Sequence, residues 1–429
     1  MPGRDFLQIP GPTNIPDRVL RAMDRPIVDH RGPEFGSFVR GLLPDVARVF
    51  GTQRGHVVIF PTSGTGASEA SLVNTLAPGD GVLAFDHGHF ANQFTHAASN
   101  LGMRVEEVPV DWRRPIPADV VEDVLRSDAG RAVRAVMVVH NETSTGVRND
   151  VSAIRRAMDA AGSEALLIVD TVSSLASTEF RFDEWRVDVA LTGSQKGLML
   201  PPGLGLLCIG ARALAASERG GSPRSFFDWR PVLRENEAGF FPYTPATLTL
   251  YGLREALNML FEEGLPNVYA RHRRLAAAVR AAARAWELDV YCLEDAACSD
   301  TLTAVVTPER LDSTEVIRIA RERFALSLGV GLGKVKGKLF RIGHLGALNE
   351  LEVLATIGGV DDDGTIHGVL QDGWQLGKFP GWTSAPGHHP GTHRVRCLIP
   401  RPLGQATSPA PPTIKLAAAI CTSSRGTAG

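Results

Sequence analysis

A lysine lies between two apolar runs of the sequence, within residues 188–210, DVALTGSQKGLMLPPGLGLLCIG. Both runs are typical of buried strands, and the polar break between them, residues 192–197, contains Lys196. A lysine that is desolvated at the end of a core strand has a lowered pKa, and its neutral amine can form a Schiff base with an aldehyde. The alternative is an ordinary lysine at the rim of a sheet. Other chemically active groups expected near Lys196 would favour the first interpretation.

Two other groups could act together with this lysine. The strand-like run HVVIF (56–60) leads into SGTGA (63–67) and then into a helical pattern. Because N–H groups at a helix N-terminus attract anions, this turn is a candidate phosphate site, although it lacks the Gly-Lys-Ser/Thr of a nucleotide P-loop. Asp170 ends the run ALLIVD (165–170), where a carboxylate could bind a protonated ring nitrogen, a sugar hydroxyl or a metal. Taken singly, each group is also explained as the cap of a turn.

The three groups together indicate one cofactor. Each follows a predicted strand of a parallel sheet, so all three are expected at the edge where the carboxyl ends of the strands meet. Pyridoxal 5′-phosphate has a phosphate for the SGTGA turn, a ring nitrogen for Asp170 and an aldehyde for Lys196. We therefore expect this cofactor, and we expect no metal.

The elements that must position these groups alternate between strands and helices. Helical patterns at residues 66–76, 116–127 and 150–160 lie between short apolar runs. Such alternation is typical of a largely parallel sheet that is covered on both faces. The sequence thus predicts an α/β domain with a mostly parallel seven-stranded sheet. Its expected strands are residues 56–60, 81–85, 103–110, 134–140, 165–170, 187–193 and 205–210.

The pattern changes along the rest of the chain, which suggests four parts. Two long amphipathic helices at 249–264 and 267–286 are followed by a short strand and another helix, as expected of a smaller α+β domain. From residue 361 on, Pro, Gly, Ser and Thr are scattered without period. The expected parts are an N-terminal arm (1–16), a large cofactor-binding domain (17–254), a small domain (255–360) and an atypical tail (361–429).

The composition excludes several classes of partner. The 429 residues carry a formal net charge of −2, so there is no basic excess to attract nucleic acid or acidic lipid. No apolar run reaches the ~20 residues of a membrane span, and the N-terminus has no apolar signal segment. The five cysteines have neither metal-site nor redox-motif spacing, which favours reduced thiols and a cytoplasmic location.

Several stretches resemble a known enzyme family. The chain is similar, from about residue 6 to about residue 360, to the serine–glyoxylate and alanine–glyoxylate aminotransferases, which are class V, fold-type I pyridoxal-phosphate enzymes. The combination of GSQKGLMLPPG with HNETSTGV is most similar to the serine–glyoxylate branch. The matching stretches are PGPTNIP, DHRGPEF, FPTSGTGASE, HNETSTGV, IVDTVSSL, DEWRVDVALTGSQKGLMLPPGL, FFPYTPATLTLYGLREAL and FRIGHLG.

The resemblance implies a role for each cofactor-binding position. Lys196 matches the Schiff-base lysine, and Asp170 matches the carboxylate that pairs with the ring nitrogen. Gln195 matches a residue that reaches the cofactor phosphate. The phosphate loop would contain Thr65, Gly66 and Ala67.

The same resemblance implies roles for five further residues. Phe90 matches the aromatic ring that stacks on the cofactor, although core packing is the commoner fate of a phenylalanine. Val172 would pack on the opposite ring face, and Thr143 would lie near the ring hydroxyl. Thr244 matches a residue that reaches the phosphate of a neighbouring subunit, which implies a homodimer with shared active sites. Arg341 matches the arginine that binds the substrate carboxylate, for which a guanidinium is well shaped.

The expected function is transfer of an amino group from a small L-amino acid, preferably serine, to glyoxylate. His30, His140 and His344 also lie in matching stretches but receive no catalytic role, because Lys196 supplies the general base. Alanine or aspartate stays open as the donor. A cysteine desulfurase of the same fold needs a nucleophilic cysteine on a loop, and residues 320–340 contain none.

The tail departs from the family pattern. Residues 361–429 do not resemble the family, and TIKLAAA near their end is similar to translated cloning sites. The sequence therefore suggests a shifted reading frame or vector-derived residues there, with disorder the expected state. An inactive, cofactor-binding product is the alternative function if this altered tail prevents dimer formation.

Overall fold

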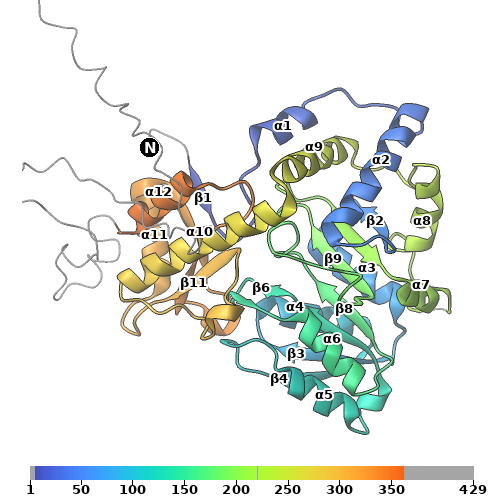
Figure 1. Ribbon diagram of the computed structural model, residues 1–429, viewed down its shortest axis with the longest axis horizontal. Helices are drawn as coiled ribbons and strands as arrows, with labels where there is room; N and C mark the ends of the chain where they lie inside the picture. Colours follow the sequence, from blue (N-terminus) through green and yellow to red (C-terminus); the bar gives the residue numbers. More distant parts are fainter. Residues whose placement is uncertain (1–4, 220, 362–429) are drawn as a thin grey trace, which may run out of the picture.

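A seven-stranded sheet forms the centre of the large domain in the computed structural model, which describes residues 5–219 and 221–361 (Figure 1). The strand order is β2-β10-β9-β8-β5-β3-β4, and β10 runs in the direction opposite to the other six strands. All seven strands coincide with predicted ones, so the mostly parallel α/β sheet is confirmed. They are β2 (His56–Phe60), β3 (Gly81–Asp86), β4 (Arg104–Pro109), β5 (Val133–Val139), β8 (Leu166–Asp170), β9 (Val189–Gly193) and β10 (Gly205–Ile209).

The central strands are buried on both faces, because successive side chains of a strand point to opposite faces and all those of β9 and β10 are buried. The edge strand β4 is largely exposed instead. Helices supply the cover, as expected of parallel strands joined by crossovers. The helices of the large domain are α1 (Asp17–Met23), α2 (Pro33–Phe50), α3 (Gly64–Thr75), α4 (His89–Asn100), α5 (Ala118–Arg126), α6 (Val151–Ala160), α7 (Ala211–Glu218), α8 (Trp229–Glu237) and α9 (Thr247–Glu263).

The carboxyl ends of six strands share one edge of the sheet. β2 is antiparallel to β10, which is antiparallel to β9, so β2 runs in the same direction as β9, β8, β5, β3 and β4. The loops after these strands therefore lie next to one another. One of them forms the small hairpin β6 (Asn141–Glu142) and β7 (Val147–Arg148) directly after β5.

A four-stranded sheet with its own apolar core forms the small domain. The strand order is β1-β12-β13-β11. Figure 1 shows α10 running from the large domain across the small one, with α11 and α12 beside the small sheet. The elements are β1 (Phe6–Gln8), β11 (Leu302–Val306), β12 (Leu326–Val330), β13 (Leu339–Gly343), α10 (Leu265–Ala285), α11 (Ser313–Phe324) and α12 (Glu350–Asp361), with short 3-10 turns at Gly130–Ala132, Asp295–Ala297 and Gly333–Val335.

Two domain boundaries differ from those expected. Residues 6–8 do not stand apart as an arm: they pair in parallel with β12 and thus belong to the small sheet. The boundary expected at residues 254 and 255 falls inside α9, whose Leu257 and Leu260 pack in the large core. The two cores meet within α10, where Val268 belongs to the large core and Leu275 to the small one. A continuous apolar stripe does not reveal which sheet it faces, so the sequence could not locate this change.

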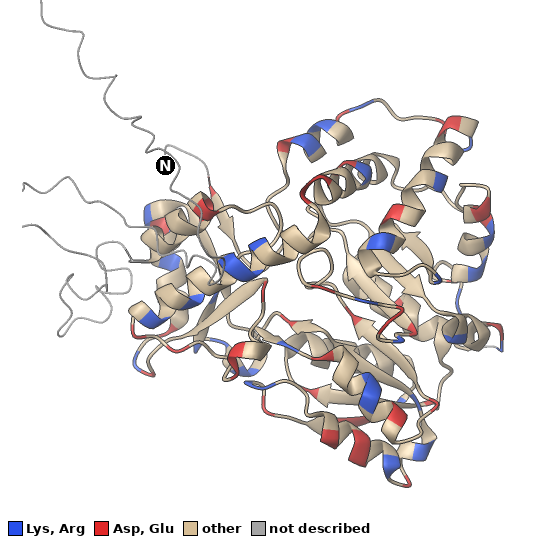
Figure 2. Cartoon of the chain, in the orientation of Figure 1, with Lys and Arg blue, Asp and Glu red and all other residues tan. Residues whose placement is uncertain are grey.

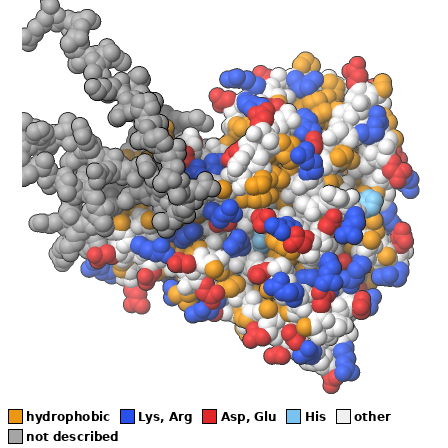
Figure 3. Space-filling model, viewed as in Figure 1, with side chains coloured by type: hydrophobic (Ala, Val, Ile, Leu, Met, Phe, Trp, Pro, Cys, Tyr) orange, Lys and Arg blue, Asp and Glu red, His pale blue; other side chains and the backbone are white. Residues whose placement is uncertain are grey.

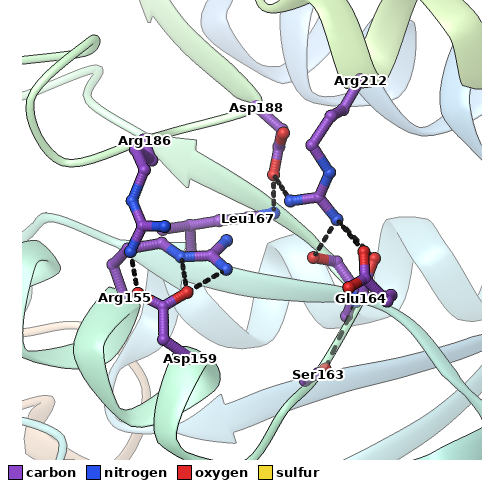
Figure 4. A network of polar contacts seen from close by, with 9 residues as sticks. Arg155, Asp159, Ser163, Glu164, Leu167, Arg186, Asp188 and Arg212 are labelled. Atoms are coloured by element: carbon purple, nitrogen blue, oxygen red, sulfur yellow. Dashed lines mark hydrogen bonds and ion pairs between the residues drawn. The ribbon is translucent and has the colours of Figure 1, made fainter.

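A network of charged side chains holds the amino ends of the central strands together (Figure 4). Asp188, just before β9, accepts a hydrogen bond from the Leu167 N–H of β8 at 2.8 Å and pairs with Arg212 at 3.2 Å. Arg155 and Arg186 both bind Asp159 nearby. This network lies at the edge of the sheet opposite the loops described above, so it serves the fold.

The surface carries charges of both signs. Figure 2 shows Lys and Arg interspersed with Asp and Glu along the outer helices, and the face in Figure 3 likewise has no region of a single sign among the described residues. Within residues 5–219 and 221–361, no helix is both long and apolar enough to cross a bilayer. The expectations for the tail, residues 361–429, concern residues that lie outside the described ones apart from the end of α12.

Candidate active site

A cavity lies at the shared carboxyl edge of the large sheet. Its walls come from the loops after β2, β3, β5, β8 and β9, so segments more than a hundred residues apart in the chain meet there. Seven of the predicted site residues line it. The lining residues are Ser63, Gly64, Thr65, Ser68, Phe90, Gln93, Phe94, Ala97, Val139, Asn141, Thr143, Asp170, Val172, Ser173, Gln195 and Lys196.

The N-terminus of α3 forms one end of the cavity. The Ser63 hydroxyl caps the helix by accepting a hydrogen bond from the Gly66 N–H at 3.3 Å. The first N–H groups of a helix have no partner inside it, and Gly64 and Thr65, which carry them, both line the cavity. This end of the cavity can therefore bind an anion such as a phosphate.

Two residues predicted for this anion site are placed differently from the others. The Gly66 N–H already donates to Ser63, and the Ala67 N–H donates to the Ser63 carbonyl at 3.0 Å. Neither residue lines the cavity. Because α3 begins at Gly64, Gly66 and Ala67 come after the two residues whose N–H groups are free.

Asp170 lies at the carboxyl end of β8 and faces the cavity. Its Oδ1 accepts a hydrogen bond from the Val172 N–H at 2.7 Å. Burial raises the pKa of Asp170 to about 7, the Val172 N–H counteracts this, the Glu142 carboxylate adds to the rise, and Lys196 opposes it. A carboxyl group in such surroundings gains a great deal from a cationic partner, which would restore its charge.

Lys196 follows β9 and shares the cavity with Asp170. Burial lowers the pKa of its amine to about 8, the Arg341 charge lowers it further, and Asp170 acts in the opposite sense. A neutral amine is thus available close to physiological pH. That is the form needed for attack on an aldehyde and for removal of a proton from carbon.

Four further predicted residues also line the cavity, and their contacts with a cofactor stay predictions. Phe90 lines the cavity from the first turn of α4, and its N–H donates to Glu142 Oε2 at 3.1 Å. Val172 packs on Gly64, because a Cβ added there would lie 2.8 Å from its Cγ2. Thr143 and Gln195 also line the cavity.

Arg341 is buried in β13 of the small domain and does not itself line the cavity. Its Nε donates to the Val330 carbonyl at 2.8 Å, and its Nη1 donates to the Thr143 carbonyl at 2.7 Å. Burial lowers the pKa of Arg341 to about 10, and Glu142 counteracts part of this. The guanidinium is therefore held beside a lining residue and close enough to Lys196 to affect its charge.

Thr244 is exposed and lies away from the cavity of its own chain. Its contact with the phosphate of a second subunit stays a prediction.

The three histidines of the matching stretches, His30, His140 and His344, are also outside the cavity. His140 donates to or accepts from Ser174 at 2.9 Å, and burial lowers the pKa of both His140 and His344 to about 3, so both are neutral.

Sequence reasoning missed several lining residues, of which Asn141 is the most informative. Its amide nitrogen donates to Ser173 at 2.8 Å and to Thr301 of the small domain at 3.1 Å. Among the described residues, its Oδ1 and the Oε1 of Gln195 are buried without a hydrogen-bond partner. Unpaired buried polar atoms on two residues that line one cavity indicate a polar ligand. The position of Asn141 directly after β5 was the available signal.

The raised pKa of Asp170 predicts a measurable pH dependence of stability. The folded, cofactor-free protein binds this proton more tightly than the unfolded chain, whose aspartate has the ordinary value of 3.8. Asp170 therefore lowers the free energy of unfolding as pH rises from about 4 to about 7, by up to ~1.4 kcal/mol per pH unit. Asp170→Asn removes this contribution, so the variant should gain stability relative to wild type over that range. Denaturant unfolding of both proteins at pH 5 and pH 7 measures the difference in their free energies of unfolding. The same difference at both pH values would contradict the raised pKa of Asp170.

Comparison with known proteins identifies the family of the chain. A sequence model of the family "Aminotransferase class-V" matches residues 6–332. The chain is 49% identical over 374 residues to the serine–glyoxylate aminotransferase of Methylorubrum extorquens, covering 86% of this chain and 93% of that protein. It is 43% identical over 357 residues to the L-aspartate–glyoxylate aminotransferase of Paracoccus denitrificans, covering 83% and 90%.

A solved structure gives the same result for the fold. The alanine–glyoxylate aminotransferase from Nostoc sp. superposes with a TM-score of 0.78 at 28% identity, covering 86% of this chain and 97% of that one. The family match and the two sequence relatives each extend over most of the chain. With its two-domain α/β architecture and a lysine at the carboxyl edge of the large sheet, the chain belongs to the class V, fold-type I aminotransferases.

Proposed function

We propose that this aminotransferase moves the amino group of L-serine to glyoxylate, with pyridoxal 5′-phosphate as cofactor, and forms hydroxypyruvate and glycine. The observation that carries the proposal is the convergence of the α3 N-terminus, Asp170 and Lys196 on one cavity. The names of the relatives support glyoxylate as the acceptor. Serine is the preferred donor because the relative named for serine is 49% identical and the one named for aspartate is 43% identical.

The residues around the cavity fit this cofactor. The anion site at the start of α3 suits its phosphate, Asp170 suits its ring nitrogen, and Phe90 and Val172 supply apolar surface for the ring faces. The unpaired Oδ1 of Asn141 is available to a polar substituent. When bound, pyridoxal phosphate supplies an aldehyde that carries the amino group and a ring that withdraws electrons from the substrate Cα.

The side chains of the chain itself then perform the proton transfers. With the cofactor bound, the Lys196 amine would hold its aldehyde, and once released the same amine would take the proton from the substrate Cα. A base with a pKa of about 8 is well matched to working near neutral pH. Asp170 would hold a proton on the ring nitrogen by its negative charge.

Arg341 is proposed to bind the carboxylate that donor and acceptor share. Its Nη1 and Nη2 form the end of the guanidinium, and the contacts with Val330 and Thr143 hold the fork in one orientation. A charge-assisted hydrogen bond contributes about 1.5–3 kcal/mol. Arg341→Leu should therefore lower kcat/KM for serine and for glyoxylate by similar factors, at least about tenfold.

Two matched variants make this prediction specific. Arg341→Lys should recover only part of the loss, because an ammonium lacks the fork. Arg155→Leu changes an arginine that is as buried as Arg341, at 7% exposed, but lies in the network at the other edge of the sheet. It should lower stability and leave kcat/KM unchanged. A loss for serine alone would show that Arg341 contacts the side chain of the donor and not the shared carboxylate.

A panel of amino donors tests the proposed function. Serine, alanine and aspartate are each supplied with glyoxylate, and glycine and the corresponding oxo acid are quantified. The expected order of kcat/KM places serine first. Aspartate is the second candidate, on account of the relative named for it. Absence of glycine with every donor would refute the proposal.

We further propose a homodimer in which Thr244 reaches the cofactor phosphate of the second subunit. The support is the exposed position of Thr244, away from the cavity of its own chain. A monomeric mass in solution would contradict it.

A cytoplasmic location is proposed from the cysteines. In the described part of the chain, Cys208, Cys292 and Cys298 are buried and form no disulfide bond.

A further inference from the structure

The N-terminal segment makes a direct contact with the amine of the proposed catalytic lysine. Nζ of Lys196 donates a hydrogen bond to the Pro10 carbonyl at 2.5 Å. The two residues are 186 positions apart in the chain. The lysine side chain therefore has a defined position that needs no bond to a cofactor.

The contact belongs to a wider attachment between this segment and the lysine loop. The Thr13 N–H donates to the Gln195 carbonyl at 3.0 Å, and the Thr13 hydroxyl donates to the Lys196 carbonyl at 3.2 Å. The backbone and the side chain of Lys196 are thus held by residues of the same short segment.

The same segment also touches the strands around Arg341. A Cβ on Gly329 of β12 would lie 2.7 Å from Pro10 Cδ, and one on Gly343 of β13 would collide with the Ile9 carbonyl. Since β1 pairs with β12, the segment is anchored in the small sheet before it reaches Lys196. Residues 8–13 therefore have a fixed path between the lysine loop and the strand that carries Arg341.

Gly11 is shaped for the lysine side chain. A Cβ on Gly11 would lie 2.6 Å from Lys196 Nζ and 2.8 Å from its Cε, and it would also overlap Cδ. Any other residue would have to displace the amine. Its φ of +95° is a further reason for glycine, because other residues are strained there. The space taken by the Lys196 side chain and the positive φ thus both require glycine at position 11.

We propose that the Pro10 carbonyl and the bare Cα of Gly11 form a docking position for the Lys196 amine during the part of each cycle in which that amine is not bonded to the cofactor. The inference rests on the proposed function, in which the amine is released and bound again in each half-reaction. A free amine on a flexible four-carbon side chain can adopt many positions. A hydrogen bond to the Pro10 carbonyl keeps it in one orientation for proton transfer. Pro10 and Gly11 are thus positioning residues.

Three variants separate the docking contact from general strain. Gly11→Ala places a methyl group where the lysine lies. Gly79→Ala is the matched control, because Gly79 has a φ of +91° and a Cβ there meets nothing within 4 Å. Thr13→Val removes one bond between the segment and the Lys196 carbonyl without adding an atom or straining the backbone.

The readout is the titration of the Lys196 amine in cofactor-free protein. Acetic anhydride labels neutral amines, and mass spectrometry of the Lys196 peptide across pH 6–11 gives a midpoint. The groups whose charges act on this amine are Asp170 from β8 and Arg341 from β13, and neither is changed by the variants. The wild-type midpoint should lie near 8, below the ordinary lysine value of 10.5.

Gly11→Ala should move the midpoint upward by at least about one pH unit, a tenfold change in proton affinity. Release of the amine from burial, the first cause of its lowered pKa, outweighs the loss of the Pro10 acceptor, which acts in the opposite sense. Gly79→Ala should titrate like wild type, and Thr13→Val should shift in the same direction as Gly11→Ala by less. A wild-type midpoint in Gly11→Ala, or an equal shift in Gly79→Ala, would overturn the proposal. If Gly11→Ala does not fold, a wild-type midpoint in Thr13→Val overturns it. Since no substrate or cofactor is present, these outcomes are independent of the donor panel.

Discussion

Lys196→Ala should abolish nearly all amino transfer, with kcat reduced by roughly 10⁴-fold or more. General-base catalysis alone contributes about 10²–10⁴-fold, and the same amine is proposed to hold the aldehyde of the cofactor. The buried amine with its pKa near 8 has no substitute: among the residues that line the cavity, it is the only lysine or histidine. The measurement is the rate of each half-reaction in single turnover, with glycine and hydroxypyruvate as products.

The control for this variant is Lys336→Ala, which removes an exposed lysine of the small domain. It should leave both half-reactions unchanged. Borohydride treatment of the cofactor-loaded wild type should attach the cofactor to the peptide that contains Lys196, and the Lys196→Ala protein should carry no such label. A Lys196→Ala protein that turns over at the wild-type rate would end the assignment of the catalytic lysine.

The large sheet was predictable from the sequence because its strands are buried on both faces. Runs such as HVVIF and ALLIVD have to be apolar throughout, so they are visible without any partner. Their order along the chain, with helices between them, then requires a parallel sheet whose carboxyl ends meet at one edge. That is why Lys196 and Asp170 could be expected together, and the structure places both in the same cavity.

Contacts between residues that are far apart in the sequence could not be predicted in the same way, because only the folded chain brings them together. Nothing local in PGPTNIP indicates that Pro10 meets an amine 186 residues away. Asn141 was missed because a single polar residue after a strand has many ordinary roles. The domain boundary was misplaced for a related reason, since α9 and α10 are both amphipathic and only the tertiary packing decides which core each one joins.

The start of α3 shows a finer limit of sequence reasoning. The turn SGTGA indicated an anion site, and Thr65 does line the cavity. The first helical residue, however, decides which N–H groups stay free, and a shift of one position exchanges them. With the helix beginning at Gly64 and Ser63 as its cap, the N–H groups of Gly66 and Ala67 are already used.

Asp170→Asn should lower turnover by about 10²–10⁴-fold while the fold is retained. Asparagine has nearly the same shape as aspartate, and its side-chain oxygen can still accept the hydrogen bond from the Val172 N–H. It has no charge, however, and cannot hold a proton on the ring nitrogen. The electron withdrawal that makes the substrate Cα acidic should therefore weaken, and the loss should appear in kcat of both half-reactions.

Asp188→Asn is the matched control for this prediction. Asp188 is also a buried carboxyl group that accepts a backbone hydrogen bond, from Leu167 at 2.8 Å, and burial raises its pKa as well. It lies at the amino ends of the strands, in the network of Figure 4, so its variant should lose stability and keep its single-turnover rates. Equal losses of turnover in both variants would mean that a buried charge matters only for the fold. Unchanged single-turnover rates in Asp170→Asn would refute the pairing with the ring nitrogen, because no other carboxylate lines the cavity in the described part of the chain to replace it.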